Sequence, residues 1–526
     1  MIEARDAWSR HLGVPAAGDD LRDRLSAGSI AMAAHETALA GPERPAIEID
    51  GAALTHGELD RAAGQFAGWL GARGVEAGDV ALLSSPSSLA FGIGYLGAIR
   101  AGVTVVLANP AYTAAELDHL VADSGAVVAI AAGPGLERLG GLAGTHKDLD
   151  QVVDLAALSA PGGGLEAAPV LDPVAPDADR VALLAYTSGT TGLPKAVPLT
   201  DANVLSSIRA AMLAWRWDRE DVLVHALPLF HQHGLGGLHT ALLSGSRVIV
   251  HSRFDPERLC ATLAAERASA LFAVPAIYAR LAEWAGIERA GLDRLRLLVS
   301  GSAALSPRLS ERIAELCGQP PLERYGTTES GLDISNLYDG PRRAGFVGLP
   351  LPGLELVVAS PTGEPLADGE DGEILLRGPQ VFAGYRNNPD ANAEAFHADG
   401  WFRTGDIGRI DAADGYLQIT GRLRELIITG GMNVYPREVE FALEGHAGIG
   451  KAAVVGLPSE RWGEEVAAAV VPATRAGVPA TSEADLLEFA RSRLAPYKCP
   501  KRVLFVDELP VNAMGKVVAA DVRALF

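Results

Sequence analysis

The chain has 526 residues, of which 48% are hydrophobic and 21% are charged, and its formal net charge is −20. This length exceeds what one hydrophobic core usually organises, and the composition is that of a globular chain, so we expect two or more folded domains. The acidic balance argues against a nucleic-acid partner, because phosphate backbones are bound by clustered Lys and Arg. An anionic ligand would therefore need a local site of its own.

The chain carries no pattern typical of secreted, metal-clustered or membrane proteins. Its three cysteines, Cys260, Cys317 and Cys499, are too few for a disulfide framework and lack the spacing of metal ligands. Residues 1–30 carry charges throughout, unlike a signal peptide. The most apolar stretch, residues 89–98, is far shorter than the roughly 20 residues of a membrane span. We expect no membrane span and a cytoplasmic location.

From residue 30 to 250, segments with helical periodicity alternate with short apolar runs. A helical pattern over residues 59–70 precedes the run 80–83, and a second one over 88–100 precedes the run 103–107. This alternation predicts βαβ units and largely parallel sheets covered by helices. Further strand-like runs lie at residues 181–185, 248–250, 270–274 and 297–299.

The character of the chain changes after residue 345. Glycine and proline punctuate short alternating strands over residues 345–385, which predicts a small antiparallel or barrel-like region. After about residue 423 the pattern is that of a separate α+β unit. The predicted fold class is therefore α/β, with a large N-terminal domain (1–422) of helix-covered sheets plus this β region, followed by a small, mobile α+β C-terminal domain (423–526).

Residues 186–198 form the most informative segment. A glycine- and hydroxyl-rich run leads to Lys195 and follows the predicted strand at 181–185. Glycines allow close backbone approach, while hydroxyls, N–H groups and a lysine can bind phosphate oxygens. The spacing is not that of a Walker A loop, and a plain surface hairpin is the alternative. The residues in question are Thr187, Ser188, Gly189, Thr190, Thr191 and Gly192.

A second segment, residues 323–330, follows the strand at 297–299 and the small-residue turn 300–304. Tyr325 could stack on a planar ring, Thr328 could donate to a phosphate, and Glu329 could hold Mg²⁺, which prefers carboxylate and phosphate oxygens. The alternative is a capped helix start at Thr327 or Thr328.

Three later segments also carry candidate ligand groups. Asp406, in Thr-Gly-Asp, could accept from a ribose diol, although it could also be a turn residue. The paired Gly430 and Gly431 invite close approach of backbone to ligand. Lys516 follows a glycine near the C-terminus and could bind developing negative charge. Two histidines, His231 and His233, lack further ligands at zinc spacing.

Taken in order, these segments resemble the adenylate-forming superfamily, which includes acyl-CoA synthetases, over most of the chain from about residue 54 onward. The resemblance implies two half-reactions: a carboxylate attacks the α-phosphate of Mg·ATP to give acyl-AMP, and a thiol, usually of coenzyme A, then displaces AMP. The implied cofactors are ATP, Mg²⁺ and coenzyme A.

The resemblance also implies residue roles. The glycine-rich run and Lys195 would hold the β- and γ-phosphates, and Lys516 would stabilise the adenylation transition state. Thr328 and Glu329 would lie at the α-phosphate and Mg²⁺, and His231 would pack near the acyl group. The remaining implied positions are the adenine pocket (Gly301, Ser302, Ala303, Glu323, Arg324, Tyr325), the adjoining Gly326 and Thr327, the nucleotide ligands Asp406 and Arg422, the hinge Arg424, and the pantetheine channel (Gly430, Gly431).

Two departures from the superfamily pattern stand out. Ala196 replaces the usual glycine after the motif lysine, where its β-carbon could perturb the loop. After Lys516, the apolar residues 517–520 replace a nearby basic residue. Neither change removes a catalytic group, but both leave open whether the two half-reactions run equally well.

The acid to be activated is less clear from sequence. The acyl pocket is expected around His231, Gly236, Gly326 and Gly331. Residues 323–340 and 342–348 resemble malonyl- and short-chain acyl-CoA synthetases, but a second carboxylate needs a buried cation, for which His239 and Arg308 are the candidates. A bulkier apolar acid is the alternative.

Other functions stay open at this stage. A carrier protein could replace coenzyme A as acceptor, and the enzyme could perform mainly one half-reaction. A non-catalytic nucleotide-binding regulator is the alternative of another class. The sequence does not indicate the oligomeric state.

Overall fold

The computed structural model of the chain describes residues 8–9, 18–149, 151–187, 194–287, 291–473, 481–512 and 516–526, with the backbone alone at Ala398. Among these residues, no helix is both long and apolar enough to cross a membrane. The described strands form four sheets, two of them largely parallel and two mainly antiparallel.

The largest sheet has the strand order β15-β14-β13-β12-β11-β9-β10-β1-β2. The six neighbouring strands β13, β12, β11, β9, β10 and β1 pair in parallel. Antiparallel strands close both edges: β2 beside β1, and β14 and β15 beside β13. The parallel strands are apolar and buried on both faces, as expected for a helix-covered sheet. The strands are β1 (Pro45–Ile49), β2 (Ala52–Thr55), β9 (Val222–His225), β10 (Arg247–Val250), β11 (Ala270–Ala273), β12 (Leu297–Ser300), β13 (Leu322–Tyr325), β14 (Ile334–Ser335) and β15 (Leu349–Pro350).

The second parallel sheet has the order β6-β5-β3-β4-β7-β8. Its last pair, β7 and β8, is antiparallel, and Thr187 at the end of β7 faces Lys195 at the start of β8. The glycine-rich segment therefore connects two paired strands. The strands are β3 (Val80–Ser84), β4 (Thr104–Leu107), β5 (Val128–Ala131), β6 (Gln151–Asp154), β7 (Val181–Thr187) and β8 (Lys195–Thr200).

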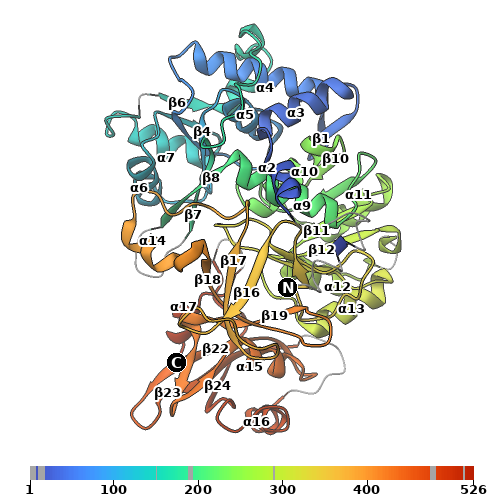
Figure 1. Cartoon of the computed structure of the whole chain (residues 1–526). Helices are drawn as coiled ribbons and strands as arrows, with labels where there is room; N and C mark the ends of the chain where they lie inside the picture. The colour runs from blue at the N-terminus through green and yellow to red at the C-terminus, as the bar shows by residue number, and fades with distance from the viewer. Residues whose placement is uncertain are drawn as a thin grey trace.

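Helices cover both sheets, as Figure 1 shows. Several begin at a residue whose side chain bonds back to the helix; Thr55, Thr113 and Thr200 each complete a capping box. The helices and short 3₁₀ turns are α2 (Asp19–Ser26), α3 (Ile30–Ala40), α4 (His56–Gly71), α5 (Leu89–Arg100), α6 (Ala114–Ser124), α7 (Pro134–Leu142), α8 (Leu155–Ser159), η1 (Leu165–Ala167), α9 (Asp201–Ala214), α10 (Gln232–Ser244), α11 (Pro256–Ala265), α12 (Pro275–Glu283), η3 (Leu292–Arg294), α13 (Pro307–Cys317), α14 (Pro389–Ala395) and η4 (Ala398–Gly400).

A small antiparallel sheet follows, in the order β16-β17-β18-β19. Its strands are β16 (Glu355–Ala359), β17 (Gly372–Arg377), β18 (Phe402–Ile410) and β19 (Leu417–Arg422). In Figure 1 it lies between the large sheets and the C-terminal elements. The first two strands fall where the sequence predicts short strands in the region 345–385.

The C-terminal elements form an α+β unit around their own apolar clusters, which are separate from the core of the large sheets. This unit is coloured orange to red at the bottom of Figure 1. It contains β20 (Ile427–Thr429), β21 (Met432–Val434), α15 (Pro436–Glu444), β22 (Ile449–Ser459), β23 (Gly463–Pro472), α16 (Glu483–Arg491), β24 (Arg502–Phe505) and α17 (Ala519–Arg523). The α/β fold class with a large first part and a smaller last part is confirmed, whereas the boundary at residue 422 stays a prediction.

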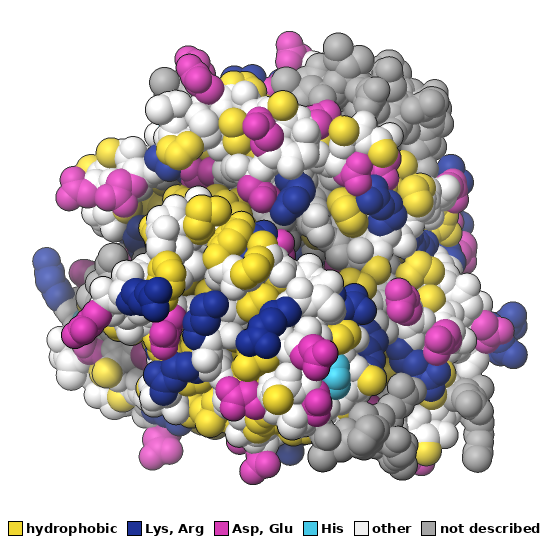
Figure 2. All heavy atoms as spheres, turned by 90° about the horizontal axis from the view of Figure 1, so that it is seen from below, with side chains coloured by type: hydrophobic (Ala, Val, Ile, Leu, Met, Phe, Trp, Pro, Cys, Tyr) yellow, Lys and Arg dark blue, Asp and Glu magenta, His cyan; other side chains and the backbone are white. Residues whose placement is uncertain are grey.

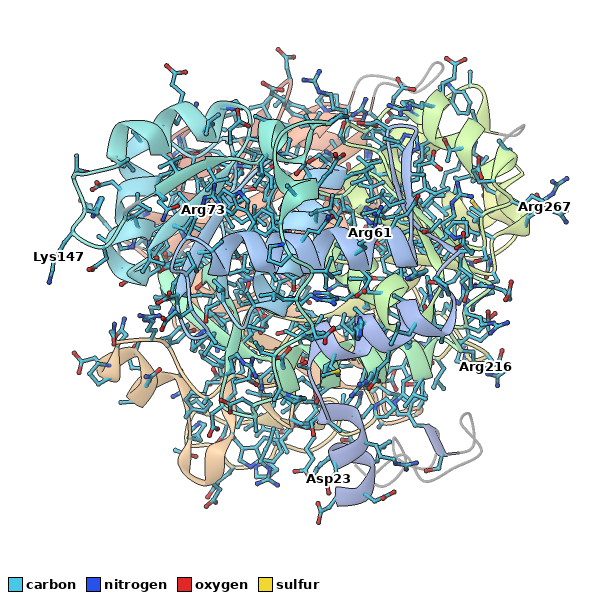
Figure 3. All side chains as sticks on the ribbon, turned by 90° about the horizontal axis from the view of Figure 1, so that it is seen from above. Asp23, Arg61, Arg73, Lys147, Arg216 and Arg267 are labelled. Carbon is cyan, nitrogen blue, oxygen red and sulfur yellow. The ribbon has the colours of Figure 1, made fainter. Side chains whose placement is uncertain are left out.

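The surface bears mixed charges. On the face shown in Figure 2, Lys and Arg side chains are interspersed with Asp and Glu among apolar and neutral atoms. The face in Figure 2 therefore does not resemble the continuous basic surface on which a phosphate backbone binds. In Figure 3, seen from the opposite side, the labelled side chains of Lys147 and Arg267 point away from the body of the protein.

Candidate active site

The candidate site lies where the parallel strands β11, β12 and β13 end. Gly301 follows the last residue of β12, and Tyr325 is the last residue of β13. Ser302 has a φ of 68°, so the chain turns sharply just after Gly301. Open parallel sheets bind ligands outside the carboxyl ends of their strands. The predicted adenine segments therefore meet at an edge that is suited to a ligand.

A buried carboxylate connects this edge to the small antiparallel sheet. The Tyr325 hydroxyl donates to Asp406 Oδ2 at 2.6 Å, and Arg422 Nε lies 3.0 Å from Asp406 Oδ1. The neighbouring Asp406 carboxylate raises the pKa of Arg422, while burial, followed by Asp406, raises that of Tyr325. Each carboxylate oxygen has further lone pairs, so Asp406 can still accept from a ribose diol.

Neighbouring residues of β13 point to opposite faces of the sheet, as residues of a strand must. The Glu323 carboxylate accepts from the Gly345 N–H at 3.0 Å, and burial raises the pKa of Glu323 to about 8. The Arg324 guanidinium instead packs on the backbone of Gly301, where a β-carbon would overlap it. Its Nε is buried and has no hydrogen-bond partner among the described residues; burial lowers the pKa of Arg324 to about 10, while the charge of Asp333 acts in the opposite direction.

The segment after Tyr325 is a series of turns and bends, not a helix, so the alternative of a capped helix start is wrong. A β-carbon on Gly326 would overlap the Gly331 carbonyl, because Gly331 N–H donates back to Thr327. Ser330 bridges Thr327 and Asp333 through bonds of 2.7 and 2.6 Å. This tight loop fixes the backbone on which Thr328 and Glu329 are carried.

Lys195 and Glu329 approach the site from different elements and meet at one tyrosine. Lys195 Nζ lies 4.8 Å from the centre of the Tyr385 ring, and the Tyr385 hydroxyl donates to Glu329 Oε1 at 2.9 Å. Burial raises the pKa of Glu329. The Thr327 side chain and the Glu329 N–H also bond to this carboxylate and lower its pKa. Carboxylate oxygens have further lone pairs for a ligand, and a bound divalent cation would favour the ionised form.

Tyr385 is a site residue that the sequence reasoning missed. It belongs to no named helix or strand and follows Gly384, which has a φ of 140°. The Asn392 side chain fixes its backbone through bonds to both the N–H and the carbonyl of Tyr385. The sequence signal that could have pointed to Tyr385 is its position after a glycine and shortly before the turn-forming residues Asn387-Asn388-Pro389.

The residue beside Lys195 is accommodated without distortion. Ala196 is buried within β8 and paired with Tyr186, and its carbonyl accepts from the Arg386 N–H at 3.0 Å. The substitution of glycine by alanine thus places the β-carbon in the core. The predicted phosphate ligands Ser188, Gly189, Thr190, Thr191 and Gly192 lie outside the described residues.

Lys516 of the C-terminal unit lies at the site of the large part. The pKa of Lys516 is lowered by partial burial and then by the charges of Arg422 and Arg324, while Asp406 acts in the opposite direction. The side chain keeps access to solvent. Its backbone is held by Asn512, whose side chain accepts the Lys516 N–H at 3.0 Å. The structure therefore brings the predicted transition-state lysine to the predicted nucleotide site.

Two histidines border the same space. His231 precedes α10, and burial together with the charges of Lys516 and Arg324 lowers the pKa of His231 to about 4. His233 Nδ1 lies 3.1 Å from Ser302 Oγ, and its buried Nε2 has no partner among the described residues. Both rings are neutral near pH 7. Among the described residues, no three or more His, Cys, Asp or Glu side chains gather in a cluster that could hold a metal ion.

The two cations suggested for a second substrate carboxylate are wrong. His239 is fully buried against the Tyr95 hydroxyl at 2.7 Å, and burial lowers the pKa of His239 to about 3, so its ring is neutral. Arg308 donates to backbone carbonyls of the C-terminal unit, 3.2 Å away at His446. The sequence could not reveal these partners, since both are distant along the chain.

The remaining predicted residues have these positions. A β-carbon on Gly236 would contact Ile208 at 3.6 Å, and one on Gly331 would approach Ser207 Oγ at 2.6 Å. Ala303 is exposed after the sharp turn. Arg424 lies in η5 (Leu423–Glu425), between β19 and β20, and its charge acts on Tyr385. Gly430 and Gly431 have positive φ in the β20–β21 hairpin, where Gly430 faces the Trp462 ring and Gly431 faces open space.

Comparison with known proteins places this site in a family. Residues 34–386 match the AMP-binding enzyme family, and residues 438–516 match its C-terminal domain. The chain therefore belongs to the AMP-binding enzyme family, within the adenylate-forming superfamily that includes acyl-CoA synthetases. It is an acid–thiol ligase of that kind, as the resemblance predicted.

Its relatives are named for different acids. The chain is 36% identical over 502 residues to a feruloyl-CoA synthase of Amycolatopsis sp, covering 92% of this chain and 96% of that protein. It is 36% identical over 495 residues to an oxalate–CoA ligase of Arabidopsis thaliana, covering 90% and 94%. ATP-bound MatB from Rhodopseudomonas palustris superposes with a TM-score of 0.88 at 34% identity, covering 94% and 98%.

The buried histidines predict that the protein loses stability in mild acid. Burial lowers the pKa to about 3 for both His225 and His239, against about 6.5 when unfolded. Between these values the unfolded state binds more protons, so the free energy of unfolding falls as pH falls below 6.5, by up to about 1.4 kcal/mol per pH unit for each group. Thermal unfolding at pH 7.5, 6 and 5 measures this decline.

A variant assigns the decline to burial. His239→Gln should flatten the dependence of the melting temperature on pH, because it removes one of the two buried rings whose pKa is lowered to about 3. A melting temperature that stays constant from pH 7.5 to 5 would show that the buried histidines are not neutral in the folded state.

Proposed function

We propose that this protein activates a carboxylic acid with Mg·ATP to form acyl-AMP and pyrophosphate, and then transfers the acyl group to coenzyme A. The observation that carries this proposal is the convergence of two clusters at one sheet edge. One contains Tyr325, Asp406 and Arg422, and the other contains Lys195, Tyr385 and Glu329. Lys516 reaches the first of them from the C-terminal unit.

The residues present fit the substrate ATP and a magnesium ion. Asp406 can accept from the ribose hydroxyls, while the Tyr325 ring offers a flat surface to the base. Glu329 supplies a hard oxygen ligand of the kind that Mg²⁺ prefers. When bound, the ion would neutralise charge on the phosphate oxygens.

The chain's own groups then account for the first half-reaction. The acid is already ionised near pH 7, so no general base is needed, which agrees with a neutral His231. Lys516 and Lys195 are fixed cations for the charge that spreads over the phosphate oxygens as the carboxylate attacks. For the second half-reaction, the thiol attacks the acyl carbon and AMP leaves with the carboxylate oxygen.

We further propose that the acid carries a second anionic group. Arg324 supports this: its guanidinium packs on Gly301, its charge acts on His231, and its buried Nε has no hydrogen-bond partner among the described residues. The carboxyl group of Asp333 acts on it, but burial raises the pKa of Asp333 to about 7. A buried guanidinium that is only partly compensated is costly, and a substrate carboxylate would pair with it. The oxalate–CoA ligase relative, and a human mitochondrial malonate–CoA ligase that is 36% identical over 349 residues and covers 59% of each chain, are named for such acids.

The test is acid-dependent exchange of pyrophosphate into ATP without coenzyme A, followed by thioester analysis with coenzyme A or a carrier protein as acceptor. We expect exchange with short dicarboxylic acids to exceed that with monocarboxylic acids of matched length, or with ferulate, by at least about 100-fold in kcat/KM. If no acid tested supports pyrophosphate exchange, the ligase proposal is contradicted. Preference for an uncharged aromatic acid would contradict the second anionic group alone.

A further inference from the structure

Two arginines, one from each side of the boundary between the large part and the C-terminal unit, reach across to the other side. Arg308 lies in the first turn of α13, in the large part. Its Nη1 donates toward three carbonyls of the C-terminal unit: His446 at 3.2 Å, Ile449 at 3.3 Å and Ala447 at 3.5 Å. In Figure 1, α13 lies above this boundary and α15 lies below it.

The three acceptors belong to one turn, between the end of α15 and the start of β22. All three lie beyond Glu444, the last residue of α15, and Ile449 is already the first residue of β22. A positive side chain from another part of the chain reaches this segment near the carboxyl end of the helix, where a cation is favoured. Arg308 thus connects the large part to the C-terminal unit through backbone carbonyls. The contact therefore does not depend on which side chains occupy residues 446, 447 and 449.

Arg437 makes the reciprocal contact. It lies in the first turn of α15, and its Nη2 donates to the Ala304 carbonyl at 3.3 Å. Its Nη1 is fixed by Glu440 at 2.9 Å. Ala304 directly follows the residues 301–303 that border the nucleotide site. The contact therefore joins α15 to the same loop that the proposed nucleotide would touch.

Both contacts depend on one orientation of the C-terminal unit. The two parts are joined through η5, and the same orientation that places His446 at Arg308 places Lys516 beside Asp406 and Arg422. Rotation about this connection would move the acceptor carbonyls and Lys516 together. The bonds of Arg308 consequently stabilise the arrangement in which Lys516 is at the site.

We propose that Arg308 is a positioning residue for adenylation: it favours the orientation that serves the first half-reaction and has no part in the second. This inference rests on the proposed two-step function. Hydrogen bonds from a charged donor contribute about 1.5–3 kcal/mol, so their loss should shift the balance between orientations by roughly 10- to 100-fold.

The experiment compares Arg308→Met, which keeps the length of the side chain but removes its donors, with Arg308→Lys and the wild type. Arg312→Met is the matched control, because Arg312 lies on the same helix and pairs only with the nearby Glu315 among the described residues. Each protein is assayed for pyrophosphate exchange and, separately, for thioester formation from supplied acyl-AMP. Hydrogen exchange of the amides at 446–449 gives a readout independent of activity.

We expect Arg308→Met to lower the kcat of exchange by at least about 10-fold with unchanged KM for ATP, while thioester formation from acyl-AMP is unchanged or faster and the 446–449 amides exchange faster. Arg308→Lys should recover part of the exchange rate. Equal losses in both half-reactions, or no change in either, would overturn the positioning role. Failure of the proposed function itself would be recognised separately, because then no acid would support pyrophosphate exchange even in the wild-type protein.

Discussion

Replacing Lys516 with alanine is expected to slow adenylation by at least about 100-fold, the scale for loss of one oriented group that stabilises transition-state charge. Lys516 reaches the space beside Asp406, Arg422 and Arg324, where its charge would oppose the negative charge of the transition state. Thioester formation from supplied acyl-AMP should survive. Pyrophosphate exchange and single-turnover thioester formation measure the two steps.

Lys501→Ala is the control for this experiment. Lys501 is an exposed lysine of the same C-terminal unit, and its Nζ contacts the Pro496 carbonyl at 3.2 Å, away from the site. It should leave both half-reactions unchanged. Equal loss of both steps in the Lys516 variant would show that the lysine supports the fold of the unit and not the transition state.

Replacing Arg324 with glutamine is expected to lower kcat/KM for a dicarboxylic acid by about 100-fold or more, because a buried carboxylate would lose its ion pair. Activity with a monocarboxylic acid of matched length should be unchanged or higher, since that acid has no second carboxylate to pair with the guanidinium. The KM for ATP should not move. Exchange assays with both acids measure the effect.

Arg324→Lys is the informative companion, because it keeps the charge but not the planar fork, and it should recover only part of the activity. The competing assignment, that Arg324 binds the nucleotide, predicts a different pattern: a raised KM for ATP and equal losses with every acid. That pattern would contradict the proposed role of Arg324 in acid selection.

Local patterns predicted much of the fold because the sheets are built from sequential βαβ units. Apolar runs such as 80–83 and 297–299 lie in β3 and β12, and punctuated strands after residue 345 form the antiparallel sheet. Register was the harder part. Glu323, Arg324 and Tyr325 were assigned together to an adenine pocket, but the alternation of β13 turns Arg324 toward Gly301 and away from its neighbours.

Contacts between distant segments were the part that sequence could not supply. Tyr385 links Lys195 to Glu329 across three separate segments, and no spacing along the chain indicates such a meeting. Arg308 was considered for the acyl pocket, yet its partners lie about 140 residues further along the chain, in the C-terminal unit. The contacts of Tyr385 and Arg308 depend on the direction of their side chains and on how the parts of the fold are placed, and not on residue type alone.

The most direct test of the central claim follows one oxygen atom. An acid labelled with ¹⁸O in its carboxylate is supplied with ATP, Mg²⁺ and coenzyme A, and the nucleotide product is analysed by mass spectrometry. If acyl-AMP forms and the thiol displaces AMP, one labelled oxygen must appear in AMP, with unlabelled pyrophosphate. Formation of ADP with label in inorganic phosphate, or of unlabelled AMP, would contradict adenylation of the acid.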